Sequence, residues 1–230
     1  MLKGFFEFFS RGNLLNQAFE RSRKMLEEDR EMFDAAVGSL RERDDARMDI
    51  DIYAKDQLIN AYEREVRRKV LTHLALTSSQ SIAAGLALVS IVIDIERIGD
   101  LTKNIVDLAL RHPGKLDCGN LEPDVRKIET TVKTMFTLLI EALPKGDEAK
   151  AKEVMSEHWW IARRADEILN SLIVREDPDL VCREAVSSAL YVRFLKRISA
   201  HLMNIASSVV NPFDRIGFRD DDLENPQDDE

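Results

Sequence analysis

The sequence predicts an all-α protein made of two tandem antiparallel three-helix bundles that are related by internal duplication. The segment at residues 95–106, IERIGDLTKNIV, is matched one hundred residues later by LKRISAHLMNIA at residues 195–206. A shorter match lies upstream of each copy, where DQLIN at residues 56–60 corresponds to DEILN at residues 166–170. Repeats at a fixed separation indicate that one structural unit occurs twice. No stretch alternates apolar and polar residues with β-branched enrichment, so we expect no sheet.

The first bundle is expected at residues 13–112, after an amphipathic lead at residues 1–12. Pro is absent from residues 1 to 112, which permits long uninterrupted helices. Asn13 can cap the first helix and Ser78 or Ser79 the third, because short polar side chains accept hydrogen bonds from the free N–H groups of a first turn. The three helices are expected at residues 13–42, 48–76 and 79–112.

A linker is expected at residues 113–122, because Pro113 and Gly114 stop a helix. The second bundle, at residues 123–212, repeats the plan of the first, and its short connections make neighbouring helices antiparallel. Its helices are expected at residues 123–143, 147–174 and 179–210. Residues 213–230 are expected to form a disordered acidic tail, because the last twelve residues contain seven acids and only one Arg.

Composition excludes several classes of function and location. The net charge of −9 argues against nucleic-acid binding, which requires a basic face to displace phosphate counterions. Cys118 and Cys182 have neither zinc-site nor disulfide-framework spacing, which fits a reducing compartment. No apolar run is long enough to span a bilayer, and Glu7 interrupts the apolar N-terminal lead, so we expect no signal peptide. The sequence therefore predicts a cytoplasmic protein.

The third helix of the first bundle has two apolar faces. One face is expected to form the bundle core and contains Leu88, Ile91, Ile95, Ile98, Ile105 and Ala109. The other face contains Ile82, Leu86, Val89 and Ile93 and becomes acidic further along the helix. Monomers rarely leave an apolar patch of this size in water. We expect the neighbouring bundle to cover part of this second face and a homodimer to cover the rest.

The acidic continuation of this face is a candidate metal site. Glu96 and Asp100 are four residues apart, which places both carboxylates on one side of a helix. The preceding helix offers Asp56, Asn60 and Glu63 along one stripe. Hard oxygen donors from two helices suit Mg, Mn, Fe or Ca. A solvated acidic face is the alternative, because the chain contains 42 acidic residues.

The segment ERIGD is followed by Asn104 and Ile105, and a related segment recurs about one hundred residues later. In these features the chain resembles the PhoU family over residues 13–212. The resemblance implies two three-helix bundles in which an E(D)xxxD motif and acids on the preceding helix hold a metal cluster. It assigns a divalent or trivalent Fe, Mn, Mg or Zn ion to the first bundle only, because Lys196 and Ala200 replace the acids in the second copy. The implied metal ligands are Glu96, Asp100, Asp56, Asn60 and Glu63.

The resemblance also implies a non-enzymatic regulator of phosphate uptake and phosphate-starvation signalling. Such a protein is an adaptor between a phosphate transporter's ATPase and a sensor histidine kinase, and it reaches the membrane only through its partner. Two alternatives stay open: a PhoU-domain partner of a sodium–phosphate type transporter, and a carboxylate–metal enzyme. The enzyme lacks support, since none of the four histidines has Glu three positions before it and no P-loop or nucleophile elbow is present.

Overall fold

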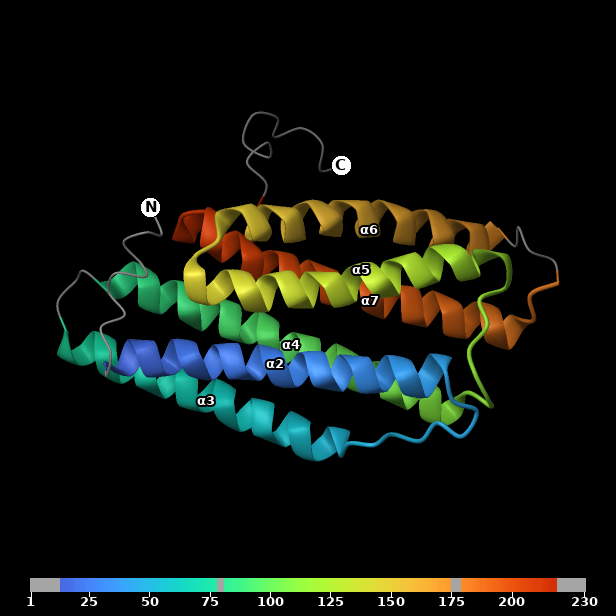
Figure 1. The fold of residues 1–230 in the computed structure, drawn as a ribbon, viewed down its shortest axis with the longest axis horizontal. Helices are drawn as coiled ribbons and strands as arrows, with labels where there is room; N and C mark the ends of the chain where they lie inside the picture. The colour runs from blue at the N-terminus through green and yellow to red at the C-terminus, as the bar shows by residue number, and fades with distance from the viewer. Residues whose placement is uncertain (1–12, 78–80, 175–178, 219–230) are drawn as a thin grey trace.

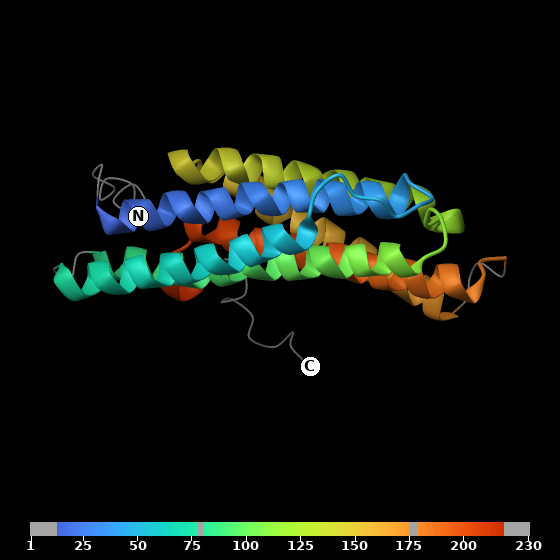
Figure 2. The same cartoon turned by 90° about the horizontal axis from the view of Figure 1, so that it is seen from below.

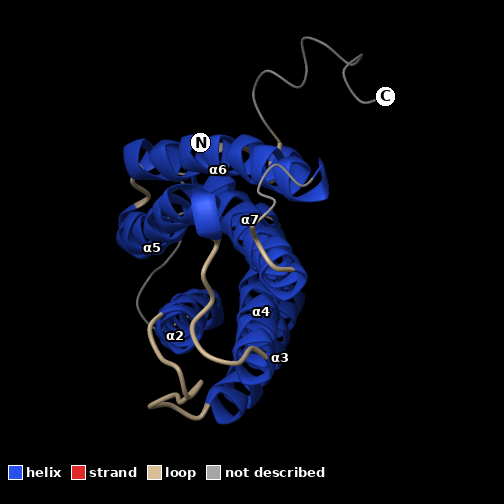
Figure 3. Cartoon of the chain, turned by 90° about the vertical axis from the view of Figure 1, so that its right-hand side faces the viewer, coloured by secondary structure: helices blue, strands red, loops and turns tan. Residues whose placement is uncertain are grey.

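The computed structural model describes residues 13–77, 81–174 and 179–218, which form six long helices and, within those ranges, no strand (Figure 1). The helices are α2 (Leu14–Arg41), α3 (Ile52–Leu76), α4 (Ile82–Arg111), α5 (Glu122–Ala142), α6 (Glu148–Val174) and α7 (Cys182–Val210). α2, α3 and α4 pack together, and so do α5, α6 and α7. The end view shows the two bundles stacked on each other (Figure 3). The predicted all-α tandem architecture is confirmed.

Polar side chains fix where the first two helices begin. The side-chain oxygen of Asn13 accepts a hydrogen bond from the backbone N–H of Asn16 at 2.7 Å, as the sequence predicts. The carboxylate of Asp51 accepts from the N–H of Ala54 at 3.0 Å in the same way. α3 therefore begins just after Asp51, later than the expected start at Met48, because the capping carboxylate satisfies its first turn.

The junction between α3 and α4 is held by a histidine. The caps expected at Ser78 and Ser79 lie outside the described residues, and α4 begins after Ser81 without a side-chain cap. The Ser81 hydroxyl instead lies 3.0 Å from Nε2 of His73, which is buried near the end of α3. This contact ties the end of one helix to the start of the next.

α4 and α7 form the contact between the two bundles (Figures 1 and 2). The predicted core face of α4 is confirmed, since all six of its residues are buried. On the second face Ile82, Leu86 and Ile93 stay 45%, 41% and 38% exposed, while Val89 packs partly against the core. The neighbouring bundle therefore covers only part of this face.

No helix in the described ranges is both long and apolar enough to cross a membrane.

A buried arginine connects the first bundle to the second. Arg41, the last residue of α2, has a fully buried side chain. Its Nε donates to Glu129 Oε1 at 2.7 Å, and its Nη2 donates to Glu122 Oε1 at 2.5 Å. The Tyr191 hydroxyl on α7 donates to the same Glu129 oxygen at 2.7 Å. Buried charges persist when they are paired and hydrogen-bonded, so this network fixes α2 against α5 and α7.

The segment between the bundles is packed onto the protein. The N–H of Leu116 donates to the carbonyl of Leu40 at 3.0 Å, and the side chains of Leu116 and Cys118 are buried. Burial raises the pKa of the Cys118 thiol to about 11. The short 3-10 helix η2 (Gly119–Leu121) then leads directly into α5. The predicted linker region is therefore part of the folded structure.

The first residues of the predicted tail are also folded. Asn211 Nδ2 donates to the carbonyls of Arg215 and Phe218 at 3.0 Å each. The N–H of Gly217 donates to the Ser207 hydroxyl at 2.8 Å, which anchors this turn to α7. The prediction of disorder is wrong for residues 213–218, because local hydrogen bonds satisfy their backbone. The lead at residues 1–12 and the acidic residues 219–230 lie outside the described residues.

Candidate functional site

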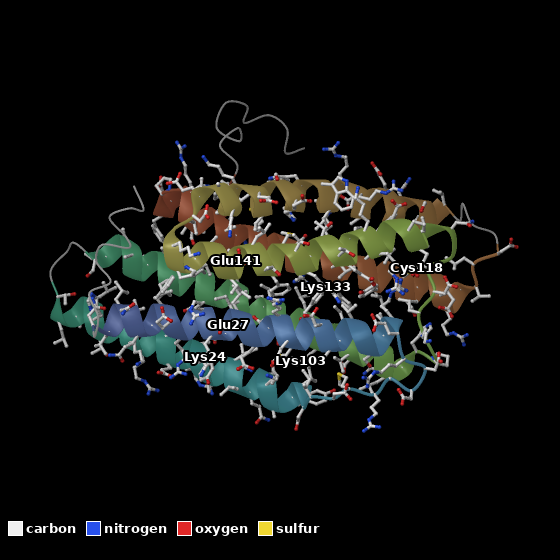
Figure 4. All side chains as sticks on the ribbon, viewed as in Figure 1. Lys24, Glu27, Lys103, Cys118, Lys133 and Glu141 are labelled. Carbon is white, nitrogen blue, oxygen red and sulfur yellow. The ribbon has the colours of Figure 1, made fainter. Side chains whose placement is uncertain are left out.

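The two helices that carry the predicted metal ligands are joined by a lysine. Lys103, which is labelled in Figure 4, places its Nζ 2.8 Å from Asp56 Oδ1 on α3 and 3.0 Å from Asp100 Oδ1 on α4. Burial acts against the charge of Lys103, but its hydrogen bonds to both carboxylates raise its pKa above the ordinary value. A single ammonium group therefore pairs with the predicted ligands Asp56 and Asp100 and offsets part of their negative charge.

The remaining predicted ligands of α3 lie along the same face. Asn60 Nδ2 donates to Asp56 Oδ2 at 3.3 Å. Glu63, whose side chain is mostly buried, pairs with Arg67 Nη2 on its own helix at 2.6 Å. Asn60 therefore positions the carboxylate of Asp56, and Glu63 has a cation of its own.

Glu96 lies one turn before Asp100 on α4, at the place that the sequence predicts. Its carboxylate is 3.7 Å from Nε of Arg97. Burial, and then the negative charges of Asp100 and Glu63, raise the pKa of Glu96 above its ordinary value. The four predicted carboxylate ligands therefore interact electrostatically across the α3–α4 contact.

A fifth acidic residue, Asp29 on α2, was missed by the sequence prediction. Its side chain is fully buried, and neither carboxylate oxygen has a hydrogen-bond partner among the described residues. Burial, followed by the charges of Asp56 and Glu96, raises its pKa well above the usual value. Asp29 Oδ1 would lie 3.0 Å from a Cβ at Gly99, the residue just before Asp100. We refer to Asp29, Asp56, Asn60, Glu63, Glu96 and Asp100 as the acidic site.

A pattern in the sequence does mark Asp29 as unusual. It lies three residues after Leu26 and three before Met32, which is the register of the buried face of α2. A carboxylate in an apolar stripe either has a partner or has a function. Spacing between acids on one helix cannot identify it, because its neighbours in the site lie on α3 and α4.

The donor set of the acidic site suits a hard cation. All its side-chain donors are carboxylate or amide oxygens, which Mg²⁺, Mn²⁺ and Fe ions accept, whereas zinc sites are usually rich in His and Cys. The unpartnered carboxylate of Asp29 fits a cation as well. In the described part of the chain no three Asp, Glu, His or Cys side chains are placed to hold a metal. Lys103 also lies between Asp56 and Asp100. Binding there therefore requires the carboxylates to move closer together and Lys103 to move away.

The second bundle replaces the acidic site with an internal ion pair. Lys196, at the position that corresponds to Glu96, places Nζ 2.6 Å and 2.7 Å from the two oxygens of Asp166. Asp166 corresponds to Asp56 in the sequence repeat. Ala200 offers no ligand where the first copy has Asp100. A lysine and one carboxylate thus neutralise each other at this place.

His201 does not serve the second copy of the motif. Its Nδ1 lies 2.7 Å from Asp94 Oδ1 on α4, and Asn204 Nδ2 donates to the same oxygen at 3.0 Å. Both contacts cross from α7 to α4, more than one hundred residues away in sequence. These side chains therefore hold the two bundles together.

Comparison with protein families gives one match that covers both halves of the chain. Residues 22–109 and residues 125–209 each match the PhoU domain. An accessory protein of the phosphate-specific transport system from Pseudomonas putida, named as a PhoU homolog, is 31% identical over 163 residues, which are 67% of this chain and 62% of that protein. An uncharacterized protein from Methanocaldococcus jannaschii is 27% identical over 173 residues, 75% of this chain and 57% of that protein. The chain thus spans less than two thirds of each relative.

Solved structures show the same fold. The crystal structure of PhoU from Pseudomonas aeruginosa has a TM-score of 0.73 at 23% identity, covering 86% of this chain and 95% of that one. The phosphate transport system regulatory protein PhoU from Streptococcus pneumoniae has a TM-score of 0.61 at 18% identity, covering 90% of each chain. At these identities the likeness concerns the fold alone.

Proposed function

This chain belongs to the PhoU family, and from that premise we propose that it regulates phosphate uptake and the response to phosphate starvation. The observation that carries the proposal is the match of both halves to the PhoU domain, together with relatives named as accessory proteins of phosphate-specific transport. On this proposal the protein is a cytoplasmic adaptor without enzymatic activity. It contacts a phosphate transporter's ATPase and a sensor histidine kinase, and it reaches the membrane through the transporter.

The two bundles support different roles in this adaptor. The first bundle carries the acidic site and a half-exposed apolar face at Ile82, Leu86 and Ile93. In the second bundle the corresponding acidic position is neutralised by Lys196 and Asp166. A regulator requires a structural state that a ligand or partner can bias, and among the described residues only the first bundle has a buried carboxyl group without a hydrogen-bond partner. We assign the responsive part of the molecule to the first bundle.

The acidic site is proposed to hold a Mg, Mn or Fe ion through Glu96, Asp100, Asp56, Asn60 and Glu63. When bound, such an ion supplies concentrated positive charge that draws the carboxylates of α3 and α4 together. Lys103 performs this task with a single charge in the structure, and its side chain is 25% exposed, so it can move into water. Replacement of the lysine ammonium group by a metal ion would tighten the contact between α3 and α4 and favour one conformation of the bundle.

Metal content of purified variants tests this site. Glu96→Ala/Asp100→Ala removes two ligands and should lose the metal that the wild type retains. Lys196→Ala is the matched control in the second bundle and should retain wild-type metal content. Lys103→Met removes the competing ammonium and should bind metal more tightly. Equal metal content in wild type and in the double variant would refute the assignment.

Deletion of the gene tests the regulatory proposal. A strain without this protein should express phosphate-starvation genes in phosphate-replete medium, because the kinase is no longer restrained. A plasmid copy of the wild-type gene should restore repression. Normal phosphate-dependent expression in the null strain would contradict the proposal and would favour a sodium–phosphate type transporter as the partner. Phosphate uptake by that transporter in the null strain is then the measurement to make.

A further inference from the structure

The buried carboxylate of Asp29 has no structural partner that accounts for its position. It is fully buried, and both of its oxygens lack a hydrogen-bond partner among the described residues. Burial of a polar group without a partner costs about 1–3 kcal/mol in proteins, and more when the group is charged. The nearby charges of Asp56, Glu96 and Asp100 are all negative and add to this cost. The position therefore destabilises the fold unless the carboxylate of Asp29 binds a proton or a cation.

The location of Asp29 places it on the inner side of the acidic site. Its Oδ1 faces Gly99, which lies between Glu96 and Asp100 on α4. A Cβ on Gly99 would also lie 3.5 Å from Cδ1 of Ile59, the neighbour of Asn60 on α3, so Asp29 and Ile59 approach the same point on α4. A third helix thus presents oxygen donors to a site whose other ligands come from α3 and α4.

The second bundle, which lacks the acidic site, shows which residue occupies the position that corresponds to Asp29. When Met32 and Phe33 of α2 are aligned with Met135 and Phe136 of α5, Asp29 corresponds to Val132, which is fully buried. In this register nine buried positions of α2 correspond to buried positions of the second bundle. They are Ser22, Met25, Leu26, Asp29, Met32, Phe33, Ala36, Ser39 and Leu40 in α2, which correspond to Val125, Ile128, Glu129, Val132, Met135, Phe136, Leu139 and Ala142 in α5 and to Leu143 just after it. An ordinary core residue therefore fits here, and the bundle that has lost the acidic motif has one.

We propose that Asp29 is an inner ligand of the acidic site, and that it binds a divalent cation together with Asp56, Glu96 and Asp100. The inference rests on the metal site proposed above and adds a ligand that the E(D)xxxD motif and its partner helix do not include. Three carboxylates from α3 and α4 plus one from α2 give the several oxygen donors that Mg²⁺ and Mn²⁺ prefer. A bound cation would link all three helices of the first bundle.

The proposal predicts opposite effects of one substitution on stability and on binding. Asp29→Val introduces the residue of the second bundle, so it should raise the thermal unfolding midpoint of the chelator-treated protein. The same change should weaken Mn²⁺ binding roughly tenfold or more. It should also reduce the rise in midpoint that a given concentration of Mn²⁺ gives the wild type. A residue with a purely structural role would not change metal affinity.

The experiment is a titration of the full, chelator-treated chain with MnCl₂. Isothermal titration calorimetry gives the affinity, the EPR signal of free Mn²⁺ gives the bound fraction, and thermal unfolding gives the midpoint. Asp29→Asn serves as a second variant that retains the side-chain size. Asp34→Asn is the matched control, because Asp34 is a half-exposed acid on the same helix that pairs with Lys133 at 3.3 Å. The control should bind Mn²⁺ like the wild type.

The outcomes separate this inference from the proposed metal site itself. Weakened binding in Asp29→Val and Asp29→Asn, with wild-type binding in Asp34→Asn, supports Asp29 as a ligand. Wild-type affinity in both Asp29 variants, with binding lost in Glu96→Ala/Asp100→Ala, overturns the role of Asp29 and leaves the site in place. No Mn²⁺ binding by the wild type overturns both.

Discussion

Replacement of Arg41 by Met should be among the most damaging single changes in the contact between the bundles. The guanidinium group is fully buried and donates to Glu129, Glu122 and the carbonyl of Leu116. Met fills much of the same volume but removes the cation that pairs with Oε1 of Glu129, whose side chain is only 5% exposed, and leaves only Arg126, 3.3 Å from Oε2. Removal of one partner from a buried ion pair costs about 3–5 kcal/mol, because the remaining charge stays buried.

That magnitude can be measured by unfolding. For a chain of this length, about 1 kcal/mol corresponds to about 2–4 °C in the unfolding midpoint, so Arg41→Met should lower it by roughly 6–20 °C. Urea unfolding monitored by circular dichroism gives the change in free energy directly. Arg41→Met/Glu129→Gln should recover part of the loss, since the second change removes the unpaired charge.

A matched control distinguishes a buried from an exposed ion pair. Arg43 lies close to Arg41 in the chain and pairs with Asp49, but both side chains are substantially exposed. Arg43→Met should leave the unfolding midpoint unchanged within error, because exposed pairs contribute little. If Arg41→Met changes the unfolding free energy as little as Arg43→Met does, the network does not fix the two bundles and the reasoning is wrong.

Two further predictions concern a buried histidine and the exposed apolar face. Burial, and then the charge of Lys196, lower the pKa of His158 from 6.5 to about 4. Between these two pH values the imidazole is protonated in the unfolded state and neutral in the folded state. Stability should fall by about 1.4 kcal/mol per pH unit below pH 6.5 from this group, and His158→Gln should reduce that slope in urea titrations at pH 7 and pH 5. The wild type should sediment as a dimer in the tens of micromolar, whereas Leu86→Glu should sediment as a monomer with an unchanged unfolding midpoint. A monomeric wild type would contradict the dimer but not the fold.

Periodicity within each helix was enough to predict the architecture. The spacing of Leu88, Ile91, Ile95 and Ile98 places them on one face, and that face is buried. The start of α3 could not be located as well, because Asp49 and Asp51 are both plausible caps by residue type. Only the structure shows that Asp51 accepts the hydrogen bond while Asp49 pairs with Arg43.

The sequence predicted those residues of the candidate site that share a helix with another predicted ligand. Glu96 and Asp100 are visible as a pair because four residues span one turn. Asp29 and Lys103 gain their roles from contacts across helices, and no spacing along the chain encodes those contacts. The same limit applies to Arg41, whose carboxylate partners Glu129 and Glu122 lie more than eighty residues away.

The central claim is that this PhoU-family chain regulates phosphate-starvation genes through the acidic site of its first bundle. The most direct test is expression from a phosphate-starvation promoter in a null strain that carries variants at equal protein levels, in phosphate-replete medium. Glu96→Ala/Asp100→Ala should fail to restore repression, whereas Lys196→Ala, its counterpart in the second bundle, should restore it fully. Full repression by the Glu96→Ala/Asp100→Ala variant would contradict the account.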